Sequence, residues 1–112
     1  MLISLLEYVG EKYRTSPLLK VKDKALDLHV LTSATSRGAI LKCMSSMRDG
    51  SQFDEATQQP TPDLNLVYAK IKSFRLEPIN PEPNMTFVIG GELLEAQRMQ
   101  GRILDEALKT FP

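Results

Sequence analysis

The C-terminal third of the chain carries the pattern that most constrains its fold. Residues 64–76 alternate in the manner of a strand, and Val67, Ala69 and Ile71 share the side suited to a core. A proline-rich connection then leads to a second strand-like run, residues 85–89. Because this connection is short, the two strands are expected to pair antiparallel. The pair should form the centre of the sheet.

From Glu92 onward the sequence has the periodicity of an amphipathic helix. The joint before it, Gly90-Gly91, is expected to be a tight strand-to-helix turn. Gly101 would cost such a helix about 1 kcal/mol relative to alanine. Gln97 and Gln100 interrupt the apolar face. These two glutamines suit either a contact with a second copy of the chain or a solvent-exposed margin of the core. The apolar positions of this face are Leu93, Ala96, Ile103, Leu104, Ala107, Leu108 and Phe111.

The N-terminal residues also recur at helical spacing and predict a first amphipathic helix that ends at residues 15–17. Its polar side carries glutamates rather than lysines, which favours a helix laid on a sheet over one laid on a membrane. The apolar residues are Leu2, Leu5, Leu6, Val9 and Tyr13. After it, residues 18–24 place lysines at alternate positions. This pattern favours a solvated edge strand over a row of phosphate contacts.

Residues 26–31 alternate as a strand with one buried face, and His29 falls on the polar side, so it is expected at the surface. Residues 36–48 predict a helix capped by Thr35 or Ser36, with Cys43 on its apolar, core-facing side. A strand that pairs back on 26–31 is the alternative for this segment.

Residues 50–63 predict a long mobile loop, because they contain prolines, glutamines and acidic residues but a single large apolar residue, Phe53. Phe53 either anchors this loop to the body of the protein or is offered to a partner.

Together these segments predict a single α+β domain over residues 1–112, in the order α-β-α-β-β-α. An antiparallel sheet of about three strands would be covered by the N- and C-terminal helices. Fourteen basic residues balance fourteen acidic ones, so no overall field attracts nucleic acid or anionic lipid. A single cysteine excludes an internal disulfide and any multi-cysteine zinc site, which indicates a cytoplasmic protein.

The residues that attract functional interest are Tyr68, Lys70, Lys72 and Phe74, which would share one strand face. Aromatic and basic side chains on a sheet are typical of single-stranded nucleic-acid binding, but such a face suits a protein partner equally well. No spacing predicts a catalytic site, a metal site or a cofactor. A deep pocket holding His29 with a carboxylate and Cys43 would instead indicate an enzyme.

The favoured hypothesis is therefore a small non-catalytic protein-interaction module, such as a regulator, adaptor or inhibitor. It is expected to be a homodimer that associates through the strand face 68–74 or through the last helix with Gln97 and Gln100. The alternative hypothesis is a single-stranded nucleic-acid-binding protein that uses the face 68–74.

Overall fold

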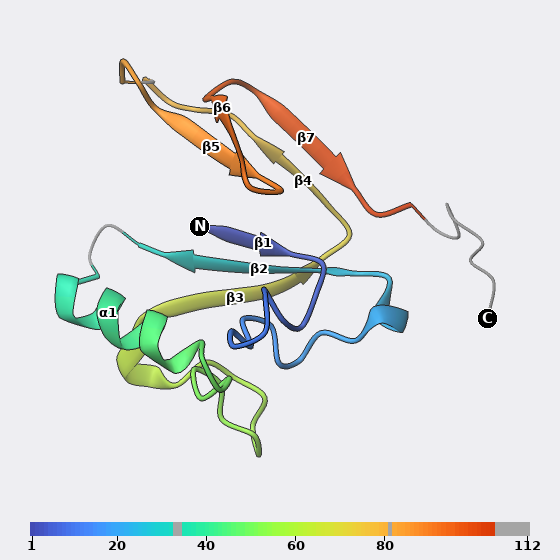
Figure 1. The fold of residues 1–112 in the computed structure, drawn as a ribbon, viewed down its shortest axis with the longest axis vertical. Coiled ribbons are helices and arrows are strands. Elements are labelled where there is room, and N and C mark those ends of the chain that lie inside the picture. Colours follow the sequence, from blue (N-terminus) through green and yellow to red (C-terminus); the bar gives the residue numbers. More distant parts are fainter. Residues whose placement is uncertain (33–34, 81, 105–112) are drawn as a thin grey trace. The chain divides into compact units, whose positions relative to one another are not determined.

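The computed structural model describes residues 1–32, 35–80 and 82–104, and it is built mainly of short strands (Figure 1). The chain divides into two compact units, of which the second is Ser73–Arg102 and the first contains the other described residues. The described residues hold one α-helix and several small sheets. The predicted sheet covered by N- and C-terminal helices is therefore wrong.

The first unit is organised on a three-stranded antiparallel sheet. Its strands are β1 (Leu2–Ser4), β2 (Leu26–Leu31) and β3 (Leu66–Ile71), with β2 in the middle. The register places Tyr68 directly opposite His29. The strand predicted at 26–31 is confirmed.

One face of this sheet is covered by α1 (Arg37–Ser46) and by the segment that follows the helix. Ser36 caps α1, because its Oγ accepts a hydrogen bond from the Ala39 amide at 3.2 Å. The helix predicted over 36–48 is thus confirmed and the alternative strand is wrong. Cys43 is fully buried, as predicted. The core cluster consists of Cys43, Phe53, Leu64 and Leu66, with Leu18, Leu31, Met47 and Tyr68 packed against it.

The segment between α1 and β3 folds back on itself. Phe53 and Pro60 form an antiparallel bridge, and the Asp54 amide donates to the Gln59 carbonyl at 2.9 Å. A 3₁₀ turn, Pro62–Leu64, then leads into β3. Phe53 is only 5% exposed, so it anchors this segment to the core. The mobility of 50–63 stays a prediction.

The predicted N-terminal helix is wrong. The backbone of Leu2–Ser4 is paired with β2 instead, and Gly10 adopts a positive φ of +73° that a helix does not allow. The extended lysine row is also wrong, since Val21–Asp23 form a 3₁₀ turn. There Asp23 Oδ2 accepts from the Lys20 amide at 3.0 Å.

The second unit contains two strand pairs. β4 (Ser73–Leu76) pairs antiparallel with β7 (Met99–Arg102), and β5 (Thr86–Ile89) pairs antiparallel with β6 (Glu92–Glu95). The predicted strand 64–76 is therefore two strands, β3 and β4, in different sheets. The expected pairing of 85–89 with 64–76 is wrong, because β5 pairs with β6.

The helix predicted from Glu92 is wrong over residues 92–104, and its expected apolar residues 107, 108 and 111 lie outside the described residues. Gly90 and Gly91 have φ values of +58° and +88°. Two successive residues with positive φ form the tight turn of a hairpin, whose twist matches that of the flanking strands. The glycine pair therefore joins two strands rather than a strand and a helix.

Gly101 is required by a close contact across β4 and β7. It lies directly opposite Phe74, and a Cβ atom at Gly101 would be 2.6 Å from two carbons of the Phe74 ring. The ring thus occupies the space that a side chain at position 101 would fill. This contact identifies Gly101 as a strand residue.

Replacing Gly101 by alanine is expected to destabilise this strand pair by about 1–2 kcal/mol, because the Phe74 ring must leave its position. Urea unfolding followed by circular dichroism measures the effect. The double variant Gly101→Ala/Phe74→Leu should recover part of the loss, which a double-mutant cycle reports as coupling. Additive effects of the two substitutions would contradict the proposed contact.

Candidate functional site

The predicted interaction face at 68–74 is divided between two strands. Tyr68 and Lys70 are two residues apart on β3 and therefore share a face. Lys72 is exposed and follows β3, whereas Phe74 belongs to β4 in the second unit. One continuous strand does not carry all four side chains.

The polar ends of Tyr68 and Lys70 are both bonded to acidic side chains of the same unit. The Tyr68 hydroxyl donates to Asp27 Oδ1 at 3.1 Å. Lys70 Nζ donates to Asp23 Oδ2 at 2.6 Å and to the Leu18 carbonyl at 2.9 Å. These two residues therefore connect β3 to the neighbouring segments, and a phosphate or a base would have to displace these bonds.

The polar side of β2 faces the core. His29 is 2% exposed, and its ring lies 5.9 Å from that of Phe53 and 5.4 Å from that of Tyr68, measured between ring centroids. Asp27 is fully buried on the same side of the strand. The expectation that His29 is a surface residue is wrong, because α1 and the segment after it pack on this side of the sheet.

Burial shifts the protonation equilibria of this group. It lowers the pKa of His29 to about 4, so the imidazole is neutral at pH 7. Burial raises the pKa of Asp27, although the hydrogen bond from Tyr68 acts in the opposite direction. Both ring nitrogens of His29 and Asp27 Oδ2 lack a hydrogen-bond partner within the part of the chain that the structure describes. Such groups are costly to bury.

Cys43 lies on the same side of the sheet, and burial raises the pKa of its thiol. A buried thiol with a raised pKa is a poor nucleophile, because the thiolate is the reactive form. The covered side of the sheet therefore holds three buried side chains: His29, Asp27 and Cys43. An open cleft in the first unit is lined by none of them.

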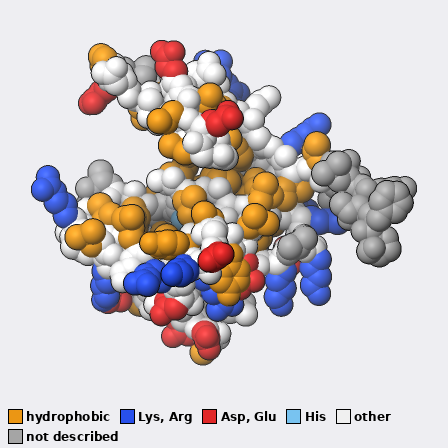
Figure 2. Space-filling model, viewed as in Figure 1, with side chains coloured by type: hydrophobic (Ala, Val, Ile, Leu, Met, Phe, Trp, Pro, Cys, Tyr) orange, Lys and Arg blue, Asp and Glu red, His pale blue; other side chains and the backbone are white. Residues whose placement is uncertain are grey.

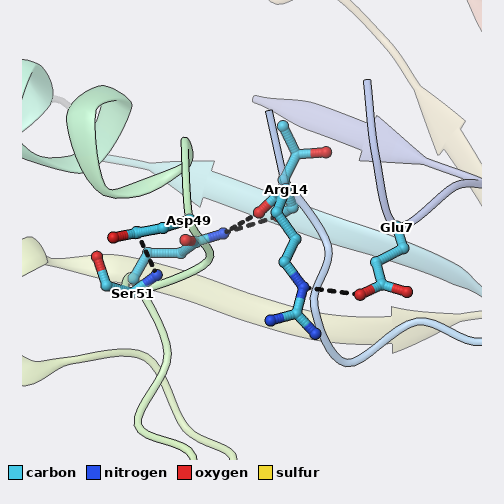
Figure 3. A network of polar contacts seen from close by, with 6 residues as sticks. Glu7, Arg14, Asp49 and Ser51 are labelled. Atoms are coloured by element: carbon cyan, nitrogen blue, oxygen red, sulfur yellow. Dashed lines mark hydrogen bonds and ion pairs between the residues drawn. The ribbon is translucent and has the colours of Figure 1, made fainter. Parts of the chain in front are cut away.

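That cleft, of about 540 Å³, lies between the N-terminal segment and the turn after α1. Arg14 Nε donates to Glu7 Oε1 at 2.7 Å, so the guanidinium in the cleft is paired (Figure 3). Buried Gln52 donates to the carbonyls of Arg14 and Thr15 at 3.2 and 2.9 Å. These bonds connect two distant segments of the chain. In the described ranges, no cluster of acidic, histidine and cysteine side chains is suited to hold a metal ion.

The other face of the three-stranded sheet carries only aliphatic side chains, and none of them belongs to the core cluster. Val67 is 54% exposed there. Of the three residues predicted to line the core, Val67 is exposed and Ala69 and Ile71 are half-buried, and none of them belongs to the core cluster on the other side of the sheet. Exposed hydrophobic side chains are visible in Figure 2. We call this surface the aliphatic sheet face, and its residues are Ile3, Leu26, Leu28, Val30, Val67, Ala69 and Ile71.

In the second unit, Gln100 is exposed on β7 directly opposite Arg75. Gln97 is exposed between β6 and β7, so the two glutamines do not share a helix face. A cleft of about 640 Å³ brings together two of the predicted site residues, Phe74 and Gln100. Its other lining residues are Ser73, Arg75, Gly101 and Arg102.

Comparison of the sequence with known protein families finds no match, and comparison with curated proteins finds none either. No helix within the described residues has both the length and the apolar character needed to cross a bilayer.

Proposed function

We propose that this protein is a small non-catalytic protein-interaction module, such as a regulator, adaptor or inhibitor, and that it acts as a homodimer. The aliphatic sheet face carries this proposal. It spans all three strands of the first unit, contains no charged residue and lies opposite the core cluster. Val67 is exposed, Leu26 is buried and the other five side chains are half-buried, so part of this apolar surface is open to a partner. Exposed apolar surface marks protein interaction sites.

A second copy of the chain is a suitable partner for this face. Two identical faces without charges meet without like-charge repulsion, and a two-fold axis places the same residues on both sides. Sheets stack face to face through such side chains at about 10 Å. The face would then provide the apolar centre of a homodimer interface.

Single-stranded nucleic-acid binding through the face 68–74 is the alternative. It is less well supported, because Tyr68 and Lys70 are bonded to Asp27 and Asp23. A salt titration separates the two hypotheses, since phosphate contacts weaken steeply with salt and an apolar interface does not. The single cysteine, buried and unpaired, favours the cytoplasm as the location.

Replacing Val67 by lysine is expected to weaken the dimer at least tenfold, because the charge would be buried between two apolar faces. Sedimentation of the wild type and the variant over a range of concentrations measures the effect. Met44→Lys is the matched control, since Met44 is equally exposed but lies on α1. A wild type that is monomeric at every concentration, or a variant that dimerises normally, would contradict the proposal.

A further inference from the structure

The strand pair β4–β7 has one polar and one apolar face. On the polar face, Ser73 lies opposite Arg102 and Arg75 lies opposite Gln100, and all four residues are exposed. The side chains of the other face are partly buried: Phe74, Leu76, Met99 and Gly101. Alternation along both strands therefore separates two different surfaces.

Three arginines lie near Gln100, two of them on the polar face of the strand pair and Arg98 just before the start of β7. Arg98 and Arg102 precede and follow it by two positions, and Arg75 lies directly across from it on β4. Diagonal neighbours such as Arg75 and Arg102 are roughly 7–8 Å apart in an antiparallel pair. We call Arg75, Arg98, Gln100 and Arg102 the arginine face.

The arginine face has an excess of positive charge on a chain whose net charge is zero. Glu77 pairs with Arg75 and also with Arg98, the latter at 3.3 Å. Arg102 has no ion pair with any residue that the structure describes. The pairs with Glu77 are exposed, and ion pairs in such positions are weak, so these guanidinium groups can exchange partners.

The surface around these arginines is hollowed. Besides the 640 Å³ cleft, a second one of about 380 Å³ is lined by Arg75, Arg98, Met99 and Gln100. Arg75 and Gln100 line both. A ligand in these clefts would meet guanidinium groups and the Gln100 amide, and in the larger cleft also Phe74.

We propose that the arginine face binds an acidic peptide segment in extended conformation. Side chains at alternate positions of an extended peptide project about 7 Å apart on one side, which matches the spacing of Arg75 and Arg102. Guanidinium groups bind carboxylates through two parallel hydrogen bonds. Carboxylates at alternate peptide positions would pair with the arginines, and the Gln100 amide would bond the segment between them.

A peptide that lies over the arginine face crosses from β4 to β7, because Arg75 and Arg102 belong to different strands. Base stacking is less well supported, because Phe74, the aromatic residue of the 640 Å³ cleft, is partly buried and its ring lies over Gly101.

The proposal is tested with the full chain and a fluorescein-labelled twelve-residue peptide of alternating glutamate and valine. Fluorescence anisotropy should show saturable binding, and the Arg75→Gln/Arg102→Gln variant should bind at least tenfold more weakly. Arg75→Lys/Arg102→Lys should show an intermediate loss, since lysine keeps the charge but not the paired hydrogen bonds. The control variant Arg37→Gln, on α1, should bind as the wild type does.

Three results would overturn the proposal. These are no binding of the peptide, equal binding of its glutamine analogue, and tighter binding of a twelve-residue oligothymidine that depends on the same arginines. Circular dichroism confirms that each variant is folded. The test is independent of the proposed homodimer, because Arg75→Gln/Arg102→Gln should sediment as the wild type does and Val67→Lys should still bind the peptide.

Discussion

Replacing Phe53 by alanine is expected to cost about 3–5 kcal/mol, a large part of the stability of a domain this small. The ring is buried in the core cluster, and its centroid lies 4.8 Å from that of Tyr68 in an edge-to-face arrangement. Alanine would leave a cavity between α1 and β3 that the surrounding backbone cannot close. Urea denaturation followed by far-ultraviolet circular dichroism measures the loss.

Two further variants test whether the loss of stability comes from the buried volume of the Phe53 ring. Phe53→Leu should cost clearly less than Phe53→Ala, because leucine fills more of the site. Met44→Ala, at an exposed position on α1, should change stability by less than about 0.5 kcal/mol. A loss below 1 kcal/mol for Phe53→Ala would show that the segment 50–63 does not close the core.

The elements that the sequence predicted correctly have local causes. α1 begins at a capping serine, and Cys43 falls on its buried side. β2 alternates clearly and has two neighbouring strands to pair with. Capping and periodicity depend on adjacent residues, so they can be recognised without knowledge of the tertiary structure.

The C-terminal helix was predicted wrongly because its residues satisfy two periods. Leu93 and Ala96 occur at helical spacing, yet Arg98, Gln100 and Arg102 also alternate with Met99 and Gly101 as in a strand. Short segments cannot be assigned by periodicity alone. The deciding factors are the hairpin turn at the glycine pair and the Phe74 ring over Gly101, and the second is a tertiary contact.

The position of His29 shows a second limit of sequence patterns. Alternation predicts that a strand has two faces, but the other segments decide which face is covered. Here α1 and Phe53 cover the side of His29 and Tyr68, and the aliphatic side is left opposite the core. The proposed sites depend on the same kind of information, because only the register of β4 and β7 brings Arg75 next to Gln100.

Acidification from pH 6.5 to about 4 is expected to destabilise the protein through His29 by about 3 kcal/mol. In the unfolded chain the imidazole binds a proton near pH 6.5, whereas burial lowers its pKa in the folded state to about 4. Between these values the unfolded state binds more protons, so the free energy of unfolding falls as the pH falls. Below about pH 4 both states are protonated and this loss is complete.

Asp27 acts in the opposite direction, because its pKa is raised by burial and the folded state takes up its proton first. Four exposed or partly exposed aspartates have lowered pKa values: Asp23, Asp49, Asp54 and Asp63. Their contribution to the free energy of unfolding is lost only below about pH 3.8, which is outside the range from pH 6.5 to 4. The slope between pH 6.5 and 4 therefore reports mainly on His29.

Two variants separate these contributions when urea unfolding is measured at several pH values. His29→Phe keeps an aromatic ring between Phe53 and Tyr68 but cannot bind a proton, so its stability should change little, or rise, as the pH falls from 6.5 to 4. Asp27→Asn removes the opposing group and should make the decline steeper than in the wild type. Phenylalanine cannot bind a proton, so the pH dependence that comes from His29 must be absent in His29→Phe. If this variant loses stability with the same slope as the wild type, the imidazole is not held neutral by burial.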